Sequence, residues 1–186
     1  MHTIGKTIGR IIGLSLWGIG LCALFGCAAS APAFPVTGDF RCEAQVNLQG
    51  QTYCGTLTRA AAGTLTFELN APESVRGWTF RLDGETVTLT LQALSYTVDP
   101  AAMPAAAPVR VLVSALDTVA RMEPGVTVTA ADGAGRTAGS CSAGTFVLSS
   151  DPETGFLRAL TVSEAGLDIR FSAFTVTAPC DPVRSN

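Results

Sequence analysis

Lysine and histidine are almost missing from this chain of 186 residues. The only lysine is Lys6 and the only histidine is His2, so every basic side chain after residue 6 is an arginine. From residue 27 onward there are ten arginines against fifteen aspartates and glutamates, a net side-chain charge of −5. Binding to nucleic acid and adsorption to anionic lipid both depend on clustered cations. The composition therefore argues against both, and we expect no nucleic-acid partner.

The same scarcity limits the chemistry that the chain can perform. Ser–His–Asp and Cys–His catalysis use an imidazole as general base, and no histidine follows residue 2. No G-x-S-x-G motif, Walker-type phosphate loop or dinucleotide-binding glycine motif is present. Carboxylates such as Glu43 and Glu68, or Asp83 and Glu85, fall in expected strands and turns, where solvated carboxylates are common. We expect a protein that is not an enzyme and needs no cofactor.

The first 26 residues have the pattern of a secretory signal. Two cations, Lys6 and Arg10, precede a run of 16 uncharged residues, IIGLSLWGIGLCALFG. This run is short for a helix that must span about 30 Å of hydrocarbon. It ends in Leu24-Phe25-Gly26-Cys27, which resembles the lipobox of bacterial lipoproteins. We predict cleavage after Gly26 and lipidation of Cys27; the alternative is an uncleaved anchor helix with an incidental thiol.

These features divide the chain into four parts. Residues 1–26 are the expected lipoprotein signal peptide, 27–37 a lipidated tether, 38–180 a single domain and 181–186 a C-terminal tail. Buried acyl chains such as palmitate contribute about 0.8 kcal/mol per methylene, and two or three chains anchor a protein stably. The expected location is therefore extracytoplasmic, anchored to the cell membrane by the lipid on Cys27.

Four cysteines remain after the signal and Cys27: Cys42, Cys54, Cys141 and Cys180. An even number in an exported protein predicts two disulfides. Cys42 and Cys54 flank an expected hairpin turn, which makes a bridge between them plausible and leaves Cys141 for Cys180. The alternative is that some of the four are buried free thiols. Their spacings of 12, 87 and 39 residues lack the close pairs of zinc sites, so we expect no metal.

From residue 38 the sequence falls into short runs in which apolar and polar residues alternate, separated by turn residues. Alternation of period two with threonine and valine is the pattern of antiparallel strands with one face in solvent. In 63–70, for example, Leu65, Phe67 and Leu69 alternate with polar residues. We expect about ten strands, over 39–48, 51–59, 63–70, 78–82, 85–91, 125–131, 136–141, 143–149, 156–162 and 167–176.

Two segments break the strand pattern. Residues 99–108 hold three prolines, which a central strand does not tolerate. Residues 109–122 place apolar side chains at helical spacing and are followed by Pro124-Gly125, which predicts a helix. One helix cannot cover so large a sheet, so the sheet must curve or leave an apolar concavity. The residues expected to line or cover this cavity are Phe67, Trp78, Phe80, Met103, Leu112 and Leu116.

The order of strands and turns over residues 38–176 resembles the LolA/LolB-like lipoprotein-carrier superfamily, and most closely its tethered lipoproteins from endospore-forming bacteria, some of which act in spore germination. The resemblance rests on Tyr53–Arg59, Gly63–Phe67, Ala71–Gly77 and Leu82–Val87, then on the loop with Pro104, the helix 112–122 and the turn at Asp151–Gly155. It implies a mainly β domain: a curved antiparallel half-barrel with a helical lid over an apolar cavity. There is no room between Cys27 and Gly38 for the long N-terminal helix of the soluble carriers, which favours a tethered role.

Two functions are open at this point. The first is a non-enzymatic lipoprotein that binds a lipid or other apolar ligand in the half-barrel cavity, and it predicts an open cavity. The alternative is a cell-surface module that binds a cell-envelope protein and regulates a cell-wall hydrolase, a role implied by the resemblance. It predicts a filled cavity and an exposed apolar patch or strand edge.

Overall fold

A computed structural model of the chain describes residues 34–176, except 61, 85, 106 and 132. The expected signal peptide, the lipidation site Cys27 and Cys180 lie outside these residues. The strands are β1 (Phe40–Leu48), β2 (Gln51–Arg59), β3 (Thr64–Ala71), β4 (Trp78–Asp83), β5 (Thr86–Leu91), β6 (Leu94–Val98), β7 (Thr127–Ala131), β8 (Ala134–Cys141), β9 (Gly144–Ser150), β10 (Leu157–Val162) and β11 (Leu167–Val176). The helices are α1 (Pro108–Ala120) and three 3-10 turns, η1 (Glu73–Val75), η2 (Pro100–Ala102) and η3 (Ser163–Ala165).

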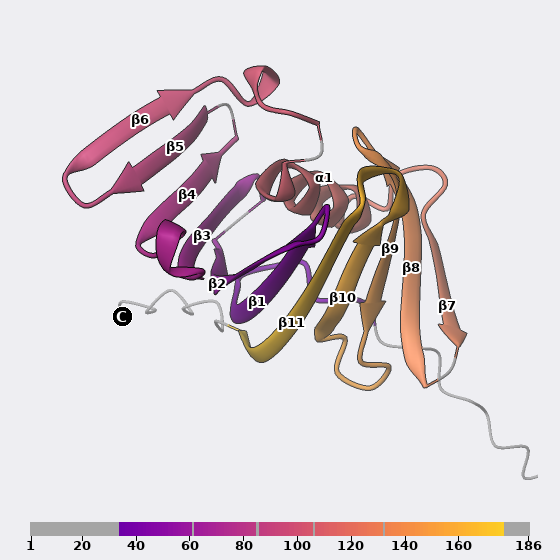
Figure 1. Ribbon diagram of the computed structural model, residues 1–186. Coiled ribbons are helices and arrows are strands. Elements are labelled where there is room, and N and C mark those ends of the chain that lie inside the picture. Colours follow the sequence, from indigo (N-terminus) through magenta and orange to yellow (C-terminus); the bar gives the residue numbers. More distant parts are fainter. Residues whose placement is uncertain (1–33, 61, 85, 106, 132, 177–186) are drawn as a thin grey trace, which may run out of the picture. The chain divides into compact units, whose positions relative to one another are not determined.

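All eleven strands form one sheet in the order β6-β5-β4-β3-β2-β1-β11-β10-β9-β8-β7 (Figure 1). Each strand pairs antiparallel with its neighbours. The first and last strands meet in the middle, where Phe40 is opposite Val176 and Leu48 is opposite Leu167. The sheet is open, with β6 and β7 as its edges. The expected fold class, mainly β and antiparallel with one α-helix in the described part of the chain, is confirmed.

Strand β6 was missed by the sequence analysis, which ended the first series of strands at residue 91. Its residues Leu94, Tyr96 and Val98 do alternate with Ser95 and Thr97. The turn before it is Gln92-Ala93, and Gln92 adopts a positive φ of 53°. Tight hairpin turns usually use asparagine, aspartate or glycine for such a conformation, so the sequence lacked the usual turn signal.

Helix α1 packs on one face of the sheet, and the sheet curves around it (Figure 1). The helix contacts β3 and β4 on one side and β8 on the other. Five strands separate β3 from β8 in the sheet order, a span of roughly 29 Å at about 4.8 Å per strand. A helix is only about 10–12 Å wide, so both contacts require a bent sheet. The bend gives the sheet a concave, apolar face toward α1.

The concave face carries the core. In β1, buried and exposed residues alternate from Phe40 to Val46, as expected for a strand with one face covered. The buried residues of α1 include Leu112, Leu116 and Val119, all with no exposed surface. They pack into the same hydrophobic cluster as Phe40 and Leu57. Burial of these side chains, at about 25 cal/mol per Å² of apolar area, is the main stabilising term for the helix.

A buried ion pair fixes the C-terminal part of α1 to the sheet. Arg59, at the end of β2, is 2% exposed, and its Nη2 donates to Oδ1 of Asp117 at 2.5 Å. Its Nε donates to the backbone carbonyl of Thr37 at 2.7 Å. Among the described residues, its Nη1 has no hydrogen-bond partner. One arginine therefore joins β2, α1 and the segment that precedes β1.

Residues 34–37, which the sequence analysis placed in the tether, pack against the domain. The N–H of Val36 donates to the carbonyl of Gly155 at 2.9 Å, and Pro35 is buried. A Cβ at Gly155 would lie 2.3 Å from the carbonyl oxygen of Phe34, so this crossing requires glycine. We call this contact, formed by residues 34–37 with Gly155 and Arg59, the clamp.

The turn that holds Gly155 is organised by one carboxylate. Asp151 accepts hydrogen bonds from the N–H groups of Glu153 and Thr154 at 3.0 and 2.9 Å. It also pairs with Arg158 at 2.6 Å. The backbone hydrogen bonds, together with Arg158, lower the pKa of Asp151 to about 2. The charged form therefore stabilises this turn at neutral pH, and this contribution is lost as the pH falls below about 4 toward 2.

We predict that Asp117→Ala strongly destabilises the domain. The substitution leaves the buried guanidinium of Arg59 without its counter-charge, which typically costs about 3–5 kcal/mol. The matched control is Glu123→Ala, which removes the exposed Arg121–Glu123 pair and should cost no more than about 1 kcal/mol. Urea unfolding of the two variants measures both values. Equal stabilities for the two variants would show that the buried pair does not hold α1.

Candidate functional site: an apolar pocket beside the start of α1

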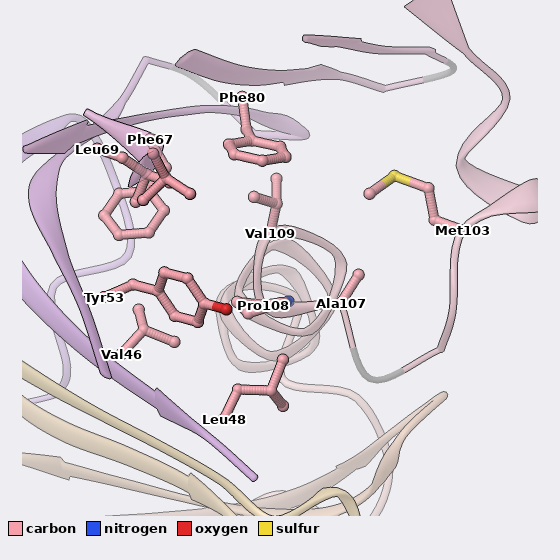
Figure 2. Close-up of a pocket in the computed structure, with 11 residues that line it drawn as sticks. Val46, Leu48, Tyr53, Phe67, Leu69, Phe80, Met103, Ala107, Pro108 and Val109 are labelled. Carbon is pink, nitrogen blue, oxygen red and sulfur yellow. The ribbon is translucent and has the colours of Figure 1, made fainter. Parts of the chain in front are cut away.

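A pocket of about 270 Å³ lies between the N-terminal end of α1 and the concave face of the sheet (Figure 2). Its walls come from four parts of the chain: β1 and β2, β3 with the turn after it, β4, and the loop that leads into α1 together with the first turn of that helix. The lining residues are Val46, Leu48, Tyr53, Phe67, Leu69, Val75, Phe80, Met103, Ala107, Pro108 and Val109.

Sheet register explains why these side chains converge. Val46 is opposite Tyr53 across β1 and β2, and Phe67 is opposite Phe80 across β3 and β4. Paired residues of an antiparallel sheet project to the same face. The concave face therefore presents neighbouring apolar side chains from adjacent strands, and the curvature of the sheet brings them around the start of α1.

The loop before α1 closes one side of the pocket. The guanidinium of Arg110 donates to the backbone carbonyl of Met103 at 2.6 Å. Upstream, the carboxylate of Asp99 accepts from the N–H of Ala101 at 2.7 Å and caps η2. Pro108 occupies the first turn of α1, where its missing N–H costs nothing. These contacts hold the Met103 side chain across the pocket from Tyr53 (Figure 2).

The pocket walls carry a single polar side-chain group, the hydroxyl of Tyr53. This hydroxyl donates to Oε1 of Gln51 at 2.6 Å. No carboxylate, guanidinium or thiol lines the pocket, so its lining offers no general acid or base in the carboxylate or imidazole range. The arrangement suits an apolar group, which gains free energy by leaving water.

Three of the six residues expected at the cavity line it: Phe67, Phe80 and Met103. Leu112 and Leu116 do not, because they point into the core and are completely buried there. Trp78 is half-buried on the same face of the sheet but is not part of the lining. The helix therefore contributes its first turn to the pocket and uses its middle for the core.

Sequence reasoning missed eight of the lining residues: Val46, Leu48, Tyr53, Leu69, Val75, Ala107, Pro108 and Val109. Alternation did place one of them, Leu69, on the apolar face of its strand. It contained no signal for where along that face the helix would leave space, since this depends on the position of α1.

The described part of the chain has no group of three or more histidine, cysteine, aspartate or glutamate side chains placed to hold a metal ion. In the same residues, no helix has the length and hydropathy needed to cross a membrane.

No protein-family model matches this chain, and no curated protein matches it. Solved structures do resemble it. An uncharacterized conserved protein from Thermus thermophilus has a TM-score of 0.47 and 10% identity, and the match covers 76% of this chain and 80% of that one. The LolA superfamily protein NE2245 from Nitrosomonas europaea has a TM-score of 0.43 and 7% identity, covering 78% and 89%.

A third match is to the structure of the CwlD amidase from Clostridioides difficile in complex with the GerS lipoprotein. It has a TM-score of 0.40 and 12% identity, and covers 76% of this chain and 84% of that chain. The solved structures similar to this chain thus include a member of the superfamily that the sequence resembles. With identities of 7–12% and TM-scores below 0.5, these matches concern the fold alone.

The expected bridge between Cys42 and Cys54 is wrong. Both are free thiols. Cys42 is opposite Leu57 on the concave face, whereas Cys54 is opposite Gln45, and positions 42 and 45 differ by an odd number of residues. The two thiols therefore project to opposite faces of the sheet. Among the described residues Cys141 has no disulfide partner; its expected partner Cys180 lies outside them, and their pairing stays a prediction.

We predict that Cys42 reacts with iodoacetamide only after unfolding, whereas half-buried Cys54 reacts in the folded protein. Burial, and secondarily the charge of Glu43, raise the pKa of the Cys42 thiol from 9.0 to about 12. The folded state thus keeps a proton that the unfolded state loses, so the stability that Cys42 contributes declines as pH rises from about 9 to 12. Peptide mass spectrometry after labelling at pH 8 measures the reactivity of the two thiols. Urea unfolding of wild type and Cys42→Ala measures their free energies of unfolding, and the difference between the two should become smaller above pH 9. A recovered Cys42–Cys54 disulfide peptide would contradict the assignment.

Proposed function

We propose that this chain is a membrane-anchored extracytoplasmic lipoprotein that binds a lipid or another apolar ligand without chemical conversion. The observation that carries the proposal is the pocket, whose lining is apolar except for one tyrosine hydroxyl. Each methylene buried there contributes about 0.8 kcal/mol. The expected anchor at Cys27 supplies the membrane location.

The size of the pocket limits the ligand. Its volume of about 270 Å³ is just below the range of roughly 300–1,000 Å³ typical of pockets for drug-sized molecules. It therefore suits one chain segment or one small ring system, rather than several acyl chains together. The half-buried side chains of Trp78 and Leu89 extend the same concave face beyond the pocket, and they offer apolar surface to the rest of a longer ligand.

A second function is favoured by β6. Leu94 and Tyr96 are 75% and 69% exposed, and both lie on the concave face because they are opposite Leu91 and Leu89. We call Leu94 and Tyr96 the β6 apolar face. The strand is an edge with no charged residue or proline, and such edges readily pair with another polypeptide. This surface supports the alternative, a module that binds a cell-envelope protein and regulates a cell-wall hydrolase.

Filling the pocket tests the first function. We predict that Ala107→Phe, which places a ring in the pocket wall, weakens binding of the fluorescent fatty acid cis-parinaric acid at least tenfold, because the ring occupies the space of the chain. Ala120→Phe is the matched control: it is the same change at the exposed, opposite end of α1, and it should bind like wild type. Fluorescence titration measures both affinities. Wild-type protein that does not bind the fatty acid, or unchanged binding by Ala107→Phe, would contradict the proposal.

Changing the β6 apolar face tests the second function. We predict that the double variant Leu94→Ser, Tyr96→Ser loses roughly tenfold or more of a protein partner's affinity, since burying one such side chain is worth about 1.5–3 kcal/mol. Both side chains are exposed, so thermal stability should change little. Thr97→Ser, on the other face of β6, is the control. Co-purification from cell envelopes measures partner yield; equal yields from all three proteins would reject β6 as the docking strand.

A further inference from the structure

The pocket and the clamp lie at opposite ends of the domain. Strand β1 begins at Phe40, three residues after Thr37 of the clamp, and ends at Leu48 in the pocket wall. Nine residues of strand span about 26 Å at about 3.3 Å per residue. Figure 1 shows this strand running from the end of the sheet where β11 finishes to the end where β11 starts.

Helix α1 gives the same result independently. Its first residue, Pro108, lines the pocket, and Asp117 binds Arg59, which also holds Thr37 in the clamp. The nine steps between Pro108 and Asp117 correspond to about 14 Å along the helix axis at about 1.5 Å each. Strand and helix therefore agree that the pocket lies at the end of the domain remote from the clamp.

The clamp also shortens the tether. If lipid is attached to Cys27, seven residue steps connect it to Phe34, at most about 25 Å when fully extended. Without the clamp the free segment would reach Gly38, eleven steps or at most about 40 Å. The clamped tether is thus no longer than β1 itself. For the pocket to touch the bilayer, the whole tether would have to stretch along the domain, at a large cost in chain entropy.

We infer that the anchored domain is oriented, with the clamp end toward its own membrane and the pocket toward the aqueous space on the far side. This inference rests on the lipid anchor of the proposed function. It specifies the side from which the ligand enters: an apolar molecule reaches the pocket from the aqueous space on the far side, rather than from the anchoring bilayer. The same orientation exposes the loop of Met103 to whatever delivers the ligand.

Charge does not supply this orientation. The clamp end carries Glu153, which is exposed, and Asp151, already paired with Arg158. No run of basic residues lies near it in the sequence, so electrostatic adsorption to lipid is weak. The orientation should therefore be insensitive to salt, which would screen a charge-based contact over about 10 Å at 0.1 M.

Energy transfer from the domain to the membrane surface tests the inference. The lipidated full-length protein is reconstituted in phosphatidylcholine vesicles that contain a rhodamine-labelled lipid as acceptor. A donor dye is attached through an azide-bearing residue at exposed Glu153, at the clamp end, or at exposed Thr52, at the pocket end. We expect transfer efficiency at least about twofold higher from position 153, given a separation of about 26 Å between the ends, at both low and high salt.

Two glycine variants test whether the clamp is the cause. Gly155→Ala places a Cβ 2.3 Å from the Phe34 carbonyl and should release the clamp, whereas Gly50→Ala meets nothing within 4 Å. Both glycines have a positive φ, 74° and 84°, so both substitutions impose similar backbone strain. The difference in transfer between positions 153 and 52 should shrink in Gly155→Ala and persist in Gly50→Ala.

The outcomes separate this inference from the proposed function. Vesicle flotation of wild type and Cys27→Ser tests the anchor, and an unanchored wild type overturns both the anchor and the orientation. If the anchored protein shows equal transfer from both positions, the orientation is wrong. If the difference in transfer is unchanged in Gly155→Ala, the clamp is not its cause. In both cases the fatty-acid titration still decides whether the pocket binds a ligand. Anchored protein with unequal transfer but no bound fatty acid contradicts the ligand alone.

Discussion

A single helix must cover the apolar face of an eleven-stranded sheet, and most features of this domain follow from that constraint. Helix α1 contacts β3 and β4 on one side and β8 on the other, which requires the sheet to curve around it. Where the helix lies centrally, its leucines pack against the sheet and close the core. Where the helix starts, and beyond its reach over β5 and β6, apolar side chains are only partly covered. The pocket and the β6 apolar face are these two uncovered regions.

The two ends of α1 are stabilised by different interactions. Toward its C-terminal end, Asp117 binds the buried guanidinium of Arg59, and the same arginine holds the segment before β1. Toward its N-terminal end, the described residues contact the helix through apolar side chains and through the Arg110–Met103 hydrogen bond. A buried ion pair tolerates little displacement because either charge alone in the interior is very unfavourable. Apolar contacts are non-directional, so the pocket end can accommodate a guest without breaking a specific interaction.

The apolar lining of the pocket and the apolar face of β6 favour the same kind of recognition. Recognition at the pocket depends on excluding water from a ligand, and recognition at β6 would depend on backbone pairing and apolar side chains. Neither mode of recognition requires an ionisable side chain in the pocket lining. The two surfaces lie on the same concave face, and Phe80 of the pocket is opposite Leu89, which in turn is opposite Tyr96. Ligand and partner binding would therefore affect neighbouring strands.

Local patterns in the sequence determined the fold class, the helix and ten of the strands, because alternation and helical spacing reflect which face of each element is covered. For the strand over 63–70 they also indicated the covered side chains, Leu65, Phe67 and Leu69. Only the tertiary structure decided what depends on strand pairing and on the position of the helix. Strand pairing directs Cys42 and Cys54 to opposite faces of the sheet, and the contact with Gly155 and Arg59 holds residues 34–37. The position of α1 buries Leu112 and Leu116 in the core and leaves Ala107 and Val109 to line the pocket. The physical reason is that registers, curvature and the placement of α1 arise from contacts between residues far apart in the chain, which no local pattern encodes.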